Sequence, residues 1–485
     1  MRKIGLFVTV MTVMCAGPVT SAMAADRFDM IRAAIPAMLA ERKVPSVAIA
    51  VAKDGKIIWE QGFGLANKEK QIPATADTTY SLASISKPLT GAALMTLVHD
   101  GKVDLDRPIN DYLGDAKITA RIGDVRTATV RRVTNHSSGL PTHYQWFYAN
   151  EPWRRPSPDE TIRRYATLMS IPGEKFEYSN LGYGVLSTMI AHVSGKSFHD
   201  AMRDNVFAPL GMTHSSVDLD SGLKAFEAIR YDTEGQPIPP YQTDHEGASA
   251  IYTSVHDLVR FGMFSLKEHL PGQQRILTDG QIAEMLTPTM MEPNGAGYGV
   301  GWERTERSGY SVYAHTGGMT GVATEFRIVP SQKLVVVVFC NAEDYDFPAI
   351  IADRIMAVMI PHWQLSSSQP SAVDVPFASR LGGTWKGLVS TYQADIPLTL
   401  TVMPSGDVHA KLGEQWEALV NRPHLTSTGF FRGIFTGSLN LPDGVRRPHV
   451  LGLNLKLRSD TVMNGEITAS ADMRGVMPTT GYILP

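Results

Sequence analysis

The sequence contains only two cysteines among its 485 residues, too few for a disulfide framework. Cys340 lies in the apolar run KLVVVVFCN, which favours a buried core thiol, and Cys15 lies in the N-terminal segment. Charged residues are also scarce, at 19% of the chain, and the formal net charge is only −3. Because no long basic run is present, the sequence predicts that nucleic acid is not a partner.

The N-terminal apolar stretch, Ile4 to Ala16, is too short to span a bilayer, which requires roughly 20 residues. Two cations precede it, and Ala22-Met23-Ala24 follows in the A-x-A pattern of a signal-peptidase site. We therefore predict a signal peptide at residues 1–24, a periplasmic or secreted protein, and no stable membrane anchor after cleavage. An uncleaved anchor is the alternative.

At this length, and with 43% hydrophobic residues, the chain has material for two or three domains. Helical spacing over residues 28–39 is followed by two strands that meet at Asp54-Gly55, a hairpin signal. Helical segments and loops dominate from Ser84 to about residue 305, and strands return after that. Strands at both ends predict an α+β (α/β) fold: an antiparallel sheet flanked by helices, with a mostly helical subdomain.

The Ser/Pro-rich segment at 363–376 interrupts this pattern and is predicted to be a linker between a unit at 25–362 and a second unit at 377–485. The second unit contains alternating segments such as PLTLTVMPSGDVHAKL and HVLGLNLKLRSD. Short alternating segments separated by turns predict a small all-β, barrel-like or sandwich domain.

The stretch YSLASISKP holds a serine and a lysine three residues apart, Ser84 and Lys87. If Ser84 opens a helix, the two side chains are neighbours, and the positive end of the helix dipole faces an anion forming at Ser84. A serine hydroxyl is a weak nucleophile without an adjacent base, and a lysine with a depressed pKa can remove its proton. A capped helix with a solvated lysine is the alternative, because S-x-x-K alone occurs by chance in many proteins.

Tyr178-Ser179-Asn180 lies between a Gly-containing turn and the apolar run LGYGVLSTMIAHV. A tyrosine needs a nearby cation to act as a base near neutral pH, and Lys87 is the cation that the sequence offers. Asn180 has both a donor and acceptors, suited to holding a lysine and a substrate amide together. Tyrosines in such positions are usually only packed, and that remains the alternative.

The segment HTGGMTG begins at His315 and follows the predicted strand YSVYA. Adjacent glycines, Gly317 and Gly318, permit close approach of a ligand backbone, and their amides could face an oxyanion together with that of Ser84. A Gly-rich hairpin turn is the alternative.

Other candidate residues are weaker. The segment THYQWFYANEPW (142–153) is interpreted either as a packed loop or as an aromatic wall for substrate. His245 and His256 lack the spacing of a metal site, so we predict structural roles for them and no metal or other cofactor. No G-x-S-x-G motif occurs, which leaves the α/β-hydrolase fold without support.

Taken in chain order, S-x-x-K, Y-S-N and H-T-G make the chain resemble the serine β-lactamase and penicillin-binding-protein-like hydrolases. The closest branch is that of class C β-lactamases, esterases and D-aminopeptidases. The resemblance covers about residues 28 to 360 and includes NHSSGLP, PGEKFEYSNLGYGVLSTMIAHVSGKSF, VFAPLGMTHSSV and GYGVGWE. It implies that the C-terminal unit is one of the lipocalin-like barrels that accompany such catalytic domains.

The resemblance also implies the roles of individual residues. Ser84 is the acylated nucleophile, Lys87 its partner, and Tyr178 the general base that later protonates the leaving group. Asn180 positions the substrate, and the amides of Ser84 and Gly318 form the oxyanion hole.

His315 departs from the family pattern, which usually has a lysine at this position. Because histidine is mostly neutral at pH 7, the departure weakens the case for a penicillin substrate.

We therefore predict a serine hydrolase that cleaves a peptide or related amide through an acyl-enzyme. The alternatives are a carboxylesterase, then a β-lactamase, and outside enzymes an acylated sensor or binding protein. The predicted partner is a small peptide or ester substrate. The sequence leaves open whether the protein forms a homo-oligomer.

Overall fold

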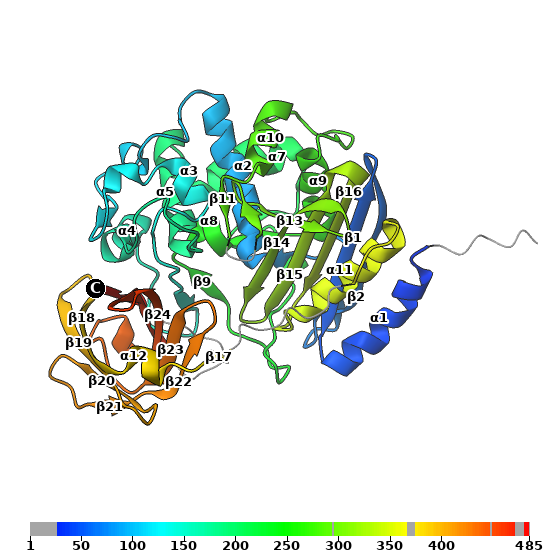
Figure 1. The fold of residues 1–485 in the computed structure, drawn as a ribbon. Helices are drawn as coiled ribbons and strands as arrows, with labels where there is room; N and C mark the ends of the chain where they lie inside the picture. The colour runs from blue at the N-terminus through cyan, green and yellow to red at the C-terminus, as the bar shows by residue number, and fades with distance from the viewer. Residues whose placement is uncertain (1–26, 293–294, 366–373, 447–448, 471–479, 485) are drawn as a thin grey trace, which may run out of the picture.

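The computed structural model describes residues 27–292, 295–365, 374–446, 449–470 and 480–484 (Figure 1). The predicted signal peptide lies outside these residues, as does the middle of the predicted linker. None of the helices in these ranges combines the length and the apolar character that crossing a bilayer requires.

A nine-stranded antiparallel sheet is the centre of the larger part of the molecule. In spatial order its strands are β11 (Met290–Met291), β12 (Gly297–Tyr298), β13 (Glu303–Arg307), β14 (Tyr310–Met319), β15 (Val322–Val329), β16 (Leu334–Cys340), β1 (Ser46–Lys53), β2 (Lys56–Asn67) and β3 (Ile72–Pro73). Strand β1 pairs with β16, so the first strands of the chain complete a sheet whose other half comes after residue 290. This confirms the predicted sheet of distant segments.

The Asp54-Gly55 turn joins β1 to β2 as the sequence predicted, with Lys53 paired to Lys56. Both turn residues have positive φ, 50° and 75°, as a two-residue hairpin of the right twist requires.

Strand β1 separates the two cores of this part by simple alternation. Val47, Ile49 and Val51 face α1 (Asp29–Arg42) and α11 (Asp346–Met359), which cover one side of the sheet (Figure 1). The alternate alanines of β1 face the helical subdomain on the other side. Their small side chains let helix α9 (Val255–Ser265) pack close to the sheet.

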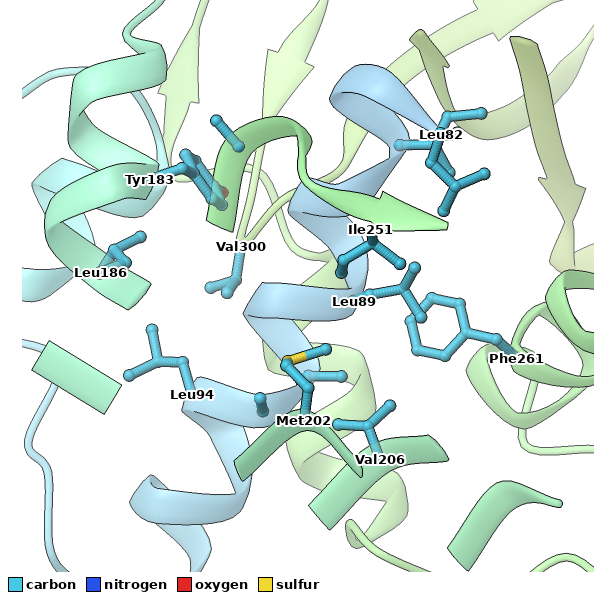
Figure 2. Close-up of a cluster of buried hydrophobic side chains, with 14 of the residues drawn as sticks. Leu82, Leu89, Leu94, Tyr183, Leu186, Met202, Val206, Ile251, Phe261 and Val300 are labelled. Carbon is cyan, nitrogen blue, oxygen red and sulfur yellow. The ribbon is translucent and has the colours of Figure 1, made fainter. Parts of the chain in front are cut away.

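Helix α2 (Ser86–His99) runs through the middle of the helical subdomain and is buried on nearly all sides. Leu89 and Leu94 of this helix pack among Tyr183, Met202 and Phe261 from other helices (Figure 2). A helix that is apolar all round belongs in a core rather than at a surface. The other helices of the subdomain are α3 (Val130–Thr134), α4 (Pro158–Tyr165), α5 (Asn180–Ser194), α6 (Phe198–Met202), α7 (Ala208–Leu210), α8 (Glu246–Ser249) and α10 (Asp279–Leu286).

Three small sheets complete this part of the molecule. They consist of β4 (Tyr80–Ser81) with β10 (Ile251–Thr253) and β8 (Ser216–Val217), of β5 (Thr119–Ala120) with β7 (Thr167–Leu168), and of β6 (Trp146–Tyr148) with β9 (Tyr241–Thr243).

The chain from residue 374 onward forms a ten-stranded antiparallel sheet that curves around its own core, together with the short helix α12 (Ala378–Leu381) (Figure 1). Its order is β17 (Asp374–Val375), β22 (Asn421–Thr426), β23 (Phe430–Phe435), β24 (Val450–Ser459), β25 (Val462–Ser470), β26 (Thr480–Leu484), β18 (Gly383–Ser390), β19 (Asp395–Val402), β20 (Val408–Leu412) and β21 (Ala418–Leu419). The prediction of an all-β unit is confirmed.

The sheet does not close into the predicted barrel over the part of the chain that the structure describes. Within the described residues the sheet ends at β17 and β21, which do not pair with each other. Each of these edge strands is two residues long.

A buried carboxylate joins the two parts of the molecule. Asp443, which is 1% exposed, accepts hydrogen bonds from Gln145 Nε2 (3.1 Å), from the Tyr392 hydroxyl (2.6 Å) and from the Tyr165 hydroxyl. Gln145 and Tyr165 belong to the helical subdomain, so Asp443 fixes the C-terminal sheet against it.

Candidate active site

Ser84 lies in a single 3₁₀ turn, η1 (Ala83–Ile85), that leads directly into α2. The sequence analysis placed Ser84 at the start of the helix itself, and the helix begins two residues later. The preceding residue, Ala83, has φ of 50°, a left-handed conformation that is costly for a residue with a Cβ atom. Such strain is typical of functional turns, and here it presents a half-buried Ser84 beside the first turn of α2.

Gly317 explains how the turn is held. A Cβ atom at this position would lie 2.1 Å from the Leu82 carbonyl oxygen and 2.2 Å from Thr324 Oγ1. The Thr324 hydroxyl donates to the same Leu82 oxygen (3.0 Å). Strand β14 therefore contacts the serine turn directly because position 317 has no side chain.

The sequence analysis attributed Gly317 and Gly318 to the approach of a ligand. At Gly317 the group that approaches is the protein's own backbone, and at Gly318 a Cβ atom would meet the ring of Tyr345 at 2.8 Å. Both glycines lie within β14 rather than after a strand. The oxyanion hole formed by the Ser84 and Gly318 amides stays a prediction.

Lys87 is fully buried and its ammonium nitrogen has three acceptors. It donates to Ser84 Oγ (3.0 Å), Asn180 Oδ1 (2.8 Å) and the Ala248 carbonyl (3.2 Å). Burial lowers the pKa of Lys87 well below its usual range. When Lys87 is neutral it has only two N–H donors, for Asn180 and Ala248, and its lone pair accepts from the Ser84 hydroxyl instead of donating to it. That arrangement pairs a base with a nucleophile.

Tyr178 contacts both Lys87 and Ser84. Its ring centroid is 4.7 Å from Lys87 Nζ, and its hydroxyl hydrogen-bonds with Ser84. Burial raises the pKa of Tyr178, and the hydrogen bond with Ser84 only partly offsets this. Burial thus favours the protonated phenol and the neutral lysine, which runs against the expectation that Lys87 makes Tyr178 a base at rest; the role of Tyr178 stays a prediction.

Asn180 is the first residue of α5, and the hydrogen bonds at the start of this helix orient its side chain. Ser179 caps the helix by accepting a hydrogen bond from the Gly182 amide (2.8 Å) and donates to the Pro141 carbonyl (2.5 Å). The Ser179 amide in turn donates to His136 Nδ1 (3.0 Å). His136 is buried, and its ring centroid is 4.4 Å from that of Tyr178, so it supports both sides of the Y-S-N motif.

His315 uses both ring nitrogens within the protein. Nδ1 donates to the Thr316 carbonyl (2.7 Å), which leaves Nε2 to accept from the Tyr298 hydroxyl (2.8 Å). Burial, reinforced by the charge of Lys87, lowers the pKa of His315 to about 3. The imidazole is therefore neutral, in line with the sequence analysis, and its ring lies 6.3 Å from that of Tyr178.

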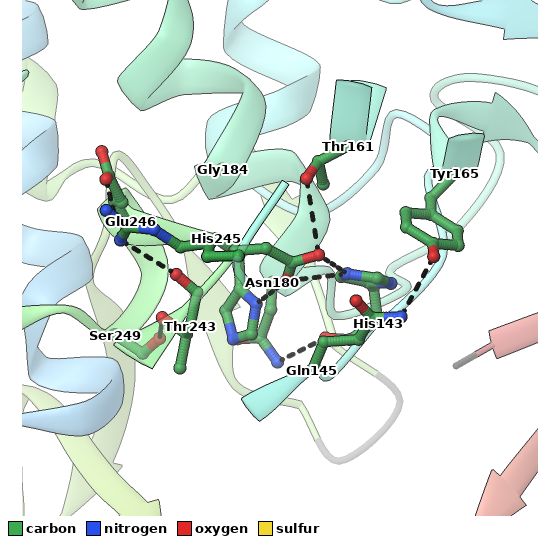
Figure 3. A network of polar contacts seen from close by, with 12 residues as sticks. His143, Gln145, Thr161, Tyr165, Asn180, Gly184, Thr243, His245, Glu246 and Ser249 are labelled. Atoms are coloured by element: carbon green, nitrogen blue, oxygen red, sulfur yellow. Dashed lines mark hydrogen bonds and ion pairs between the residues drawn. The ribbon is translucent and has the colours of Figure 1, made fainter. Parts of the chain in front are cut away.

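A second buried polar cluster lies behind Asn180 (Figure 3). Asp244 accepts from His143 Nε2 (2.9 Å) and from His245 Nδ1 (3.0 Å). Burial by itself would raise the pKa of Asp244, but the two imidazoles outweigh it and the pKa falls below its usual range. The His143 carbonyl lies 3.5 Å from Asn180 Nδ2, which connects this cluster to the catalytic candidates.

The ligand-type atoms of His143, Asp244 and His245 all lie within 4.8 Å of one another, so these residues could hold a metal ion. The hydrogen bonds among them already give the carboxylate two donors and give each imidazole an acceptor. The sequence analysis missed the cluster because His143 lies about a hundred residues from the other two. His256 is separate and pairs with Glu60 (2.8 Å).

The aromatic segment divides into two. Trp146, Phe147 and Tyr148 are buried in β6 and pack partly against Ala83 and Tyr241, which is the packed alternative. Tyr144 instead hydrogen-bonds with Asn180 and so belongs to the site. The sequence analysis interpreted the segment of Tyr144 as either a packed loop or a substrate wall, and it included GYGVGWE, which contains Tyr298, in the family resemblance. No spacing rule connects either side chain to Ser84.

Comparisons with known proteins agree with this geometry. The family model described as Beta-lactamase matches residues 31–358, which include Ser84, Lys87, Tyr178, Asn180 and His315. Protein flp of Staphylococcus aureus (strain MRSA252) is 26% identical over 324 residues, which cover 64% of this chain and 62% of that protein. The chain thus matches less than two thirds of the length of this curated relative.

Two solved structures share the fold. The octameric penicillin-binding protein homologue from Pyrococcus abyssi is 22% identical with a TM-score of 0.60, and the match covers 94% of this chain and 99% of that chain. The class C beta lactamase from Rhodobacter sphaeroides is also 22% identical, with a TM-score of 0.57, and covers 68% of this chain and 98% of that chain. The first match extends over both parts of the molecule.

Proposed function

Because the chain belongs to the Beta-lactamase family of serine hydrolases, we propose that it cleaves peptides or related amides through an acyl-enzyme on Ser84. The observation that carries the proposal is the fully buried Lys87, whose amine nitrogen is 3.0 Å from Ser84 Oγ. A solvated lysine, the alternative left open by the sequence, would be exposed and charged.

In the proposed first step, Ser84 Oγ attacks the substrate carbonyl carbon while its proton moves to the Lys87 amine. The tetrahedral intermediate then breaks its bond to the leaving nitrogen, and the Tyr178 hydroxyl gives that nitrogen a proton and recovers one from Lys87. In the second half, water attacks the ester carbonyl while Lys87 takes its proton; the bond from the acyl carbon to Ser84 Oγ then breaks, and Lys87 returns the proton to Ser84 Oγ. General acid–base help of this kind is typically worth 10²–10⁴-fold in rate.

Asn180 would hold the lysine on one side and a substrate amide on the other. Its Oδ1 accepts from Lys87 Nζ, and its amide nitrogen contacts the His143 carbonyl (3.5 Å), so a substrate carbonyl at Asn180 would replace a contact of that amide nitrogen. The Ser84 and Gly318 amides would stabilise the oxyanion.

Because His315, the first residue of the H-T-G motif, is neutral, we infer that the substrate has no carboxylate next to this residue. Both of its nitrogens are already hydrogen-bonded, and its pKa of about 3 leaves no cation there near neutral pH. This favours amides and esters over β-lactams. A carboxylesterase uses the same residues and differs only in its leaving group, so it is the second candidate.

A substrate panel tests the proposal. It comprises p-nitroanilides of L- and D-amino acids, linear peptides, p-nitrophenyl esters and nitrocefin. We expect turnover of an amide or peptide that exceeds turnover of nitrocefin. Preference for nitrocefin would make the protein a β-lactamase, and esters without amides would make it an esterase. A lasting adduct on Ser84 without turnover would instead favour an acylated sensor.

We also propose a periplasmic or secreted location, which rests on the predicted signal peptide at residues 1–24. The octameric state of the Pyrococcus abyssi homologue suggests that this chain forms oligomers as well.

A further inference from the structure

One face of the C-terminal sheet lies against the segments that carry Tyr178. In β24 the odd-numbered Leu451, Leu453 and Leu455 are buried in the core of that sheet. The even-numbered residues of the strand therefore face the other way. Asn454 and Lys456 are among them, and both line a cavity of about 260 Å³.

The cavity has one wall from each part of the molecule. Thr142, Glu177 and Tyr178 contribute the wall on the catalytic side, and Glu466 of β25 contributes to the wall on the sheet side. A volume of this size is slightly below the range for whole small-molecule ligands, roughly 300–1,000 Å³. It fits one group of a substrate rather than a complete one.

Most charged groups around the cavity already have partners. Glu177 forms ion pairs with Arg458 (3.2 Å) and with Lys175. Lys456 donates to the Thr428 carbonyl, and its ammonium lies 4.5 Å from the centroid of the Phe430 ring. That position turns the ammonium toward the loop between β22 and β23.

Glu466 differs from these groups. Asn454, its cross-strand partner, donates to its carboxylate at 3.3 Å, and the backbone of Thr142 provides a second hydrogen bond. Within the described ranges, no lysine, arginine or histidine forms an ion pair with it; Arg432 is the cation whose charge reaches it, and the Arg432 guanidinium is engaged with Asn454 Oδ1 (3.0 Å). Burial, reinforced by the charge of Glu177, raises the pKa of the Glu466 carboxyl group. A desolvated carboxylate is costly unless a cation approaches it.

Glu466 also lies close to the catalytic residues. After burial itself and the hydrogen bond with Asn180, the charge of Glu466 is the next contribution to the pKa of Tyr144. Asn180 in turn contacts Lys87 (2.8 Å). Glu466 also lines the same cavity as Tyr178, so a group bound at Glu466 would lie beside Tyr178.

We propose that this cavity is a substrate subsite for a protonated amine, and that Glu466 is the residue that selects it. An ammonium group supplies both the opposite charge and the N–H donors that the carboxylate lacks. The inference rests on the proposed function, because it assigns the binding of one group of the same substrate. It makes the C-terminal sheet a specificity element of the hydrolase.

The test measures kcat/KM for two matched substrate pairs on the full-length protein. In one pair the amine belongs to the acyl group: aminoacyl p-nitroanilides against their N-acetyl forms. In the other it belongs to the leaving group: acetylated peptides with lysine against acetyllysine after the scissile bond. The variant is Glu466→Gln, which keeps the size and the hydrogen-bonding oxygen. Glu417→Gln, a side chain 54% exposed in the loop before β21, is the matched control.

We expect the wild-type protein to prefer the cationic member of at least one pair. Glu466→Gln should reduce that preference about tenfold or more, since the acceptor loses its negative charge and the hydrogen bond to the ammonium is weakened, and Glu417→Gln should leave it unchanged. A Glu466→Gln variant that keeps the wild-type ratio, or a wild-type protein with no preference in either pair, would overturn the inference.

Fluorophosphonate labelling of Ser84 separates this failure from failure of the proposed function. If Ser84 is labelled and the neutral substrates turn over, only the amine subsite is refuted. If Ser84 is not labelled and no substrate turns over, the hydrolase itself is refuted, and the subsite with it.

Discussion

The lowered pKa of Lys87 agrees with the S-x-x-K motif, whereas the raised pKa of Tyr178 runs against its interpretation as a base. Burial favours the neutral form of both groups, lowering the pKa of Lys87 and raising that of Tyr178. The lysine is therefore the group able to accept the Ser84 proton, and the tyrosine is the group able to donate one. The two act as a coupled unit, so their apparent pKa values belong to the pair.

The first prediction concerns pH. Lys87 accepts a proton only when it is neutral, so kcat/KM should rise with pH through its lowered pKa and then level off. Lys87→Ala should lose 10²–10⁴-fold in rate together with this rising limb. Tyr178→Phe is the control: it should also be slow but should keep the rise. A pH–rate profile of Lys87→Ala that retains the rise would contradict the role of Lys87 as base.

The second prediction concerns His315. A lysine at this position would add a fixed charge able to attract a substrate carboxylate, and a hydrogen bond to a charged group is worth roughly 1.5–3 kcal/mol against about 1 for a neutral pair. His315→Lys should therefore raise the ratio of nitrocefin rate to native-substrate rate about tenfold. An unchanged or lower ratio would show that the third motif does not set this preference.

At the level of elements, strand β14 and turn η1 depend on each other. The strand approaches the Leu82 backbone only because Gly317 has no side chain, and Ala83 keeps its left-handed conformation only because the surrounding structure holds it. The geometry of Ser84 is thus set by a strand more than two hundred residues away.

The third prediction compares the two glycines of this strand. Gly317→Ala would bring a methyl group against backbone and should lower both the melting temperature and the activity strongly, by at least 100-fold in kcat/KM. Gly318→Ala meets only the ring of Tyr345, which is 54% exposed and can move, so its melting temperature should change little. Thermal unfolding followed by circular dichroism measures both, and equal losses would contradict the assignment of Gly317 to the turn.

These elements also show how far the sequence could predict the structure. Local signals identified the Asp54-Gly55 hairpin, the strands on both sides of the helical region and the S-x-x-K, Y-S-N and H-T-G motifs, because each depends on neighbouring residues. Tyr144, His143 and Glu466 reach the site through long-range packing, which leaves no periodic pattern. The sequence also could not predict the protonation state of Tyr178, because its pKa depends on burial that only the fold creates.

For the whole molecule, the question is what holds the C-terminal sheet against the catalytic part. Asp443 is buried between hydroxyl and amide donors, whereas the ion pair of Arg121 with Asp395 (2.8 Å) joins the same two parts at the surface. Loss of a buried acceptor leaves its donors desolvated and costs about 1–3 kcal/mol. Surface ion pairs are worth about 0–1 kcal/mol.

The fourth prediction follows from this contrast. Asp443→Ala should lower the free energy of unfolding by about 1–3 kcal/mol and also weaken the activity, because the sheet then moves away from the segment that includes Tyr144. Asp395→Ala should change the free energy of unfolding by less than about 1 kcal/mol and leave activity intact. Urea unfolding and kcat/KM measured on the same samples distinguish the two, and equal effects would contradict the interdomain role of Asp443.

The central claim is that Ser84 is acylated by substrate. Intact-mass spectrometry during a burst with a p-nitrophenyl ester, followed by peptide mapping, tests it most directly. The account predicts a transient adduct on the peptide that contains Ser84, which disappears as substrate is consumed, and no adduct and no turnover in a folded Ser84→Ala variant. An adduct on another residue, or turnover that persists in Ser84→Ala, would contradict it.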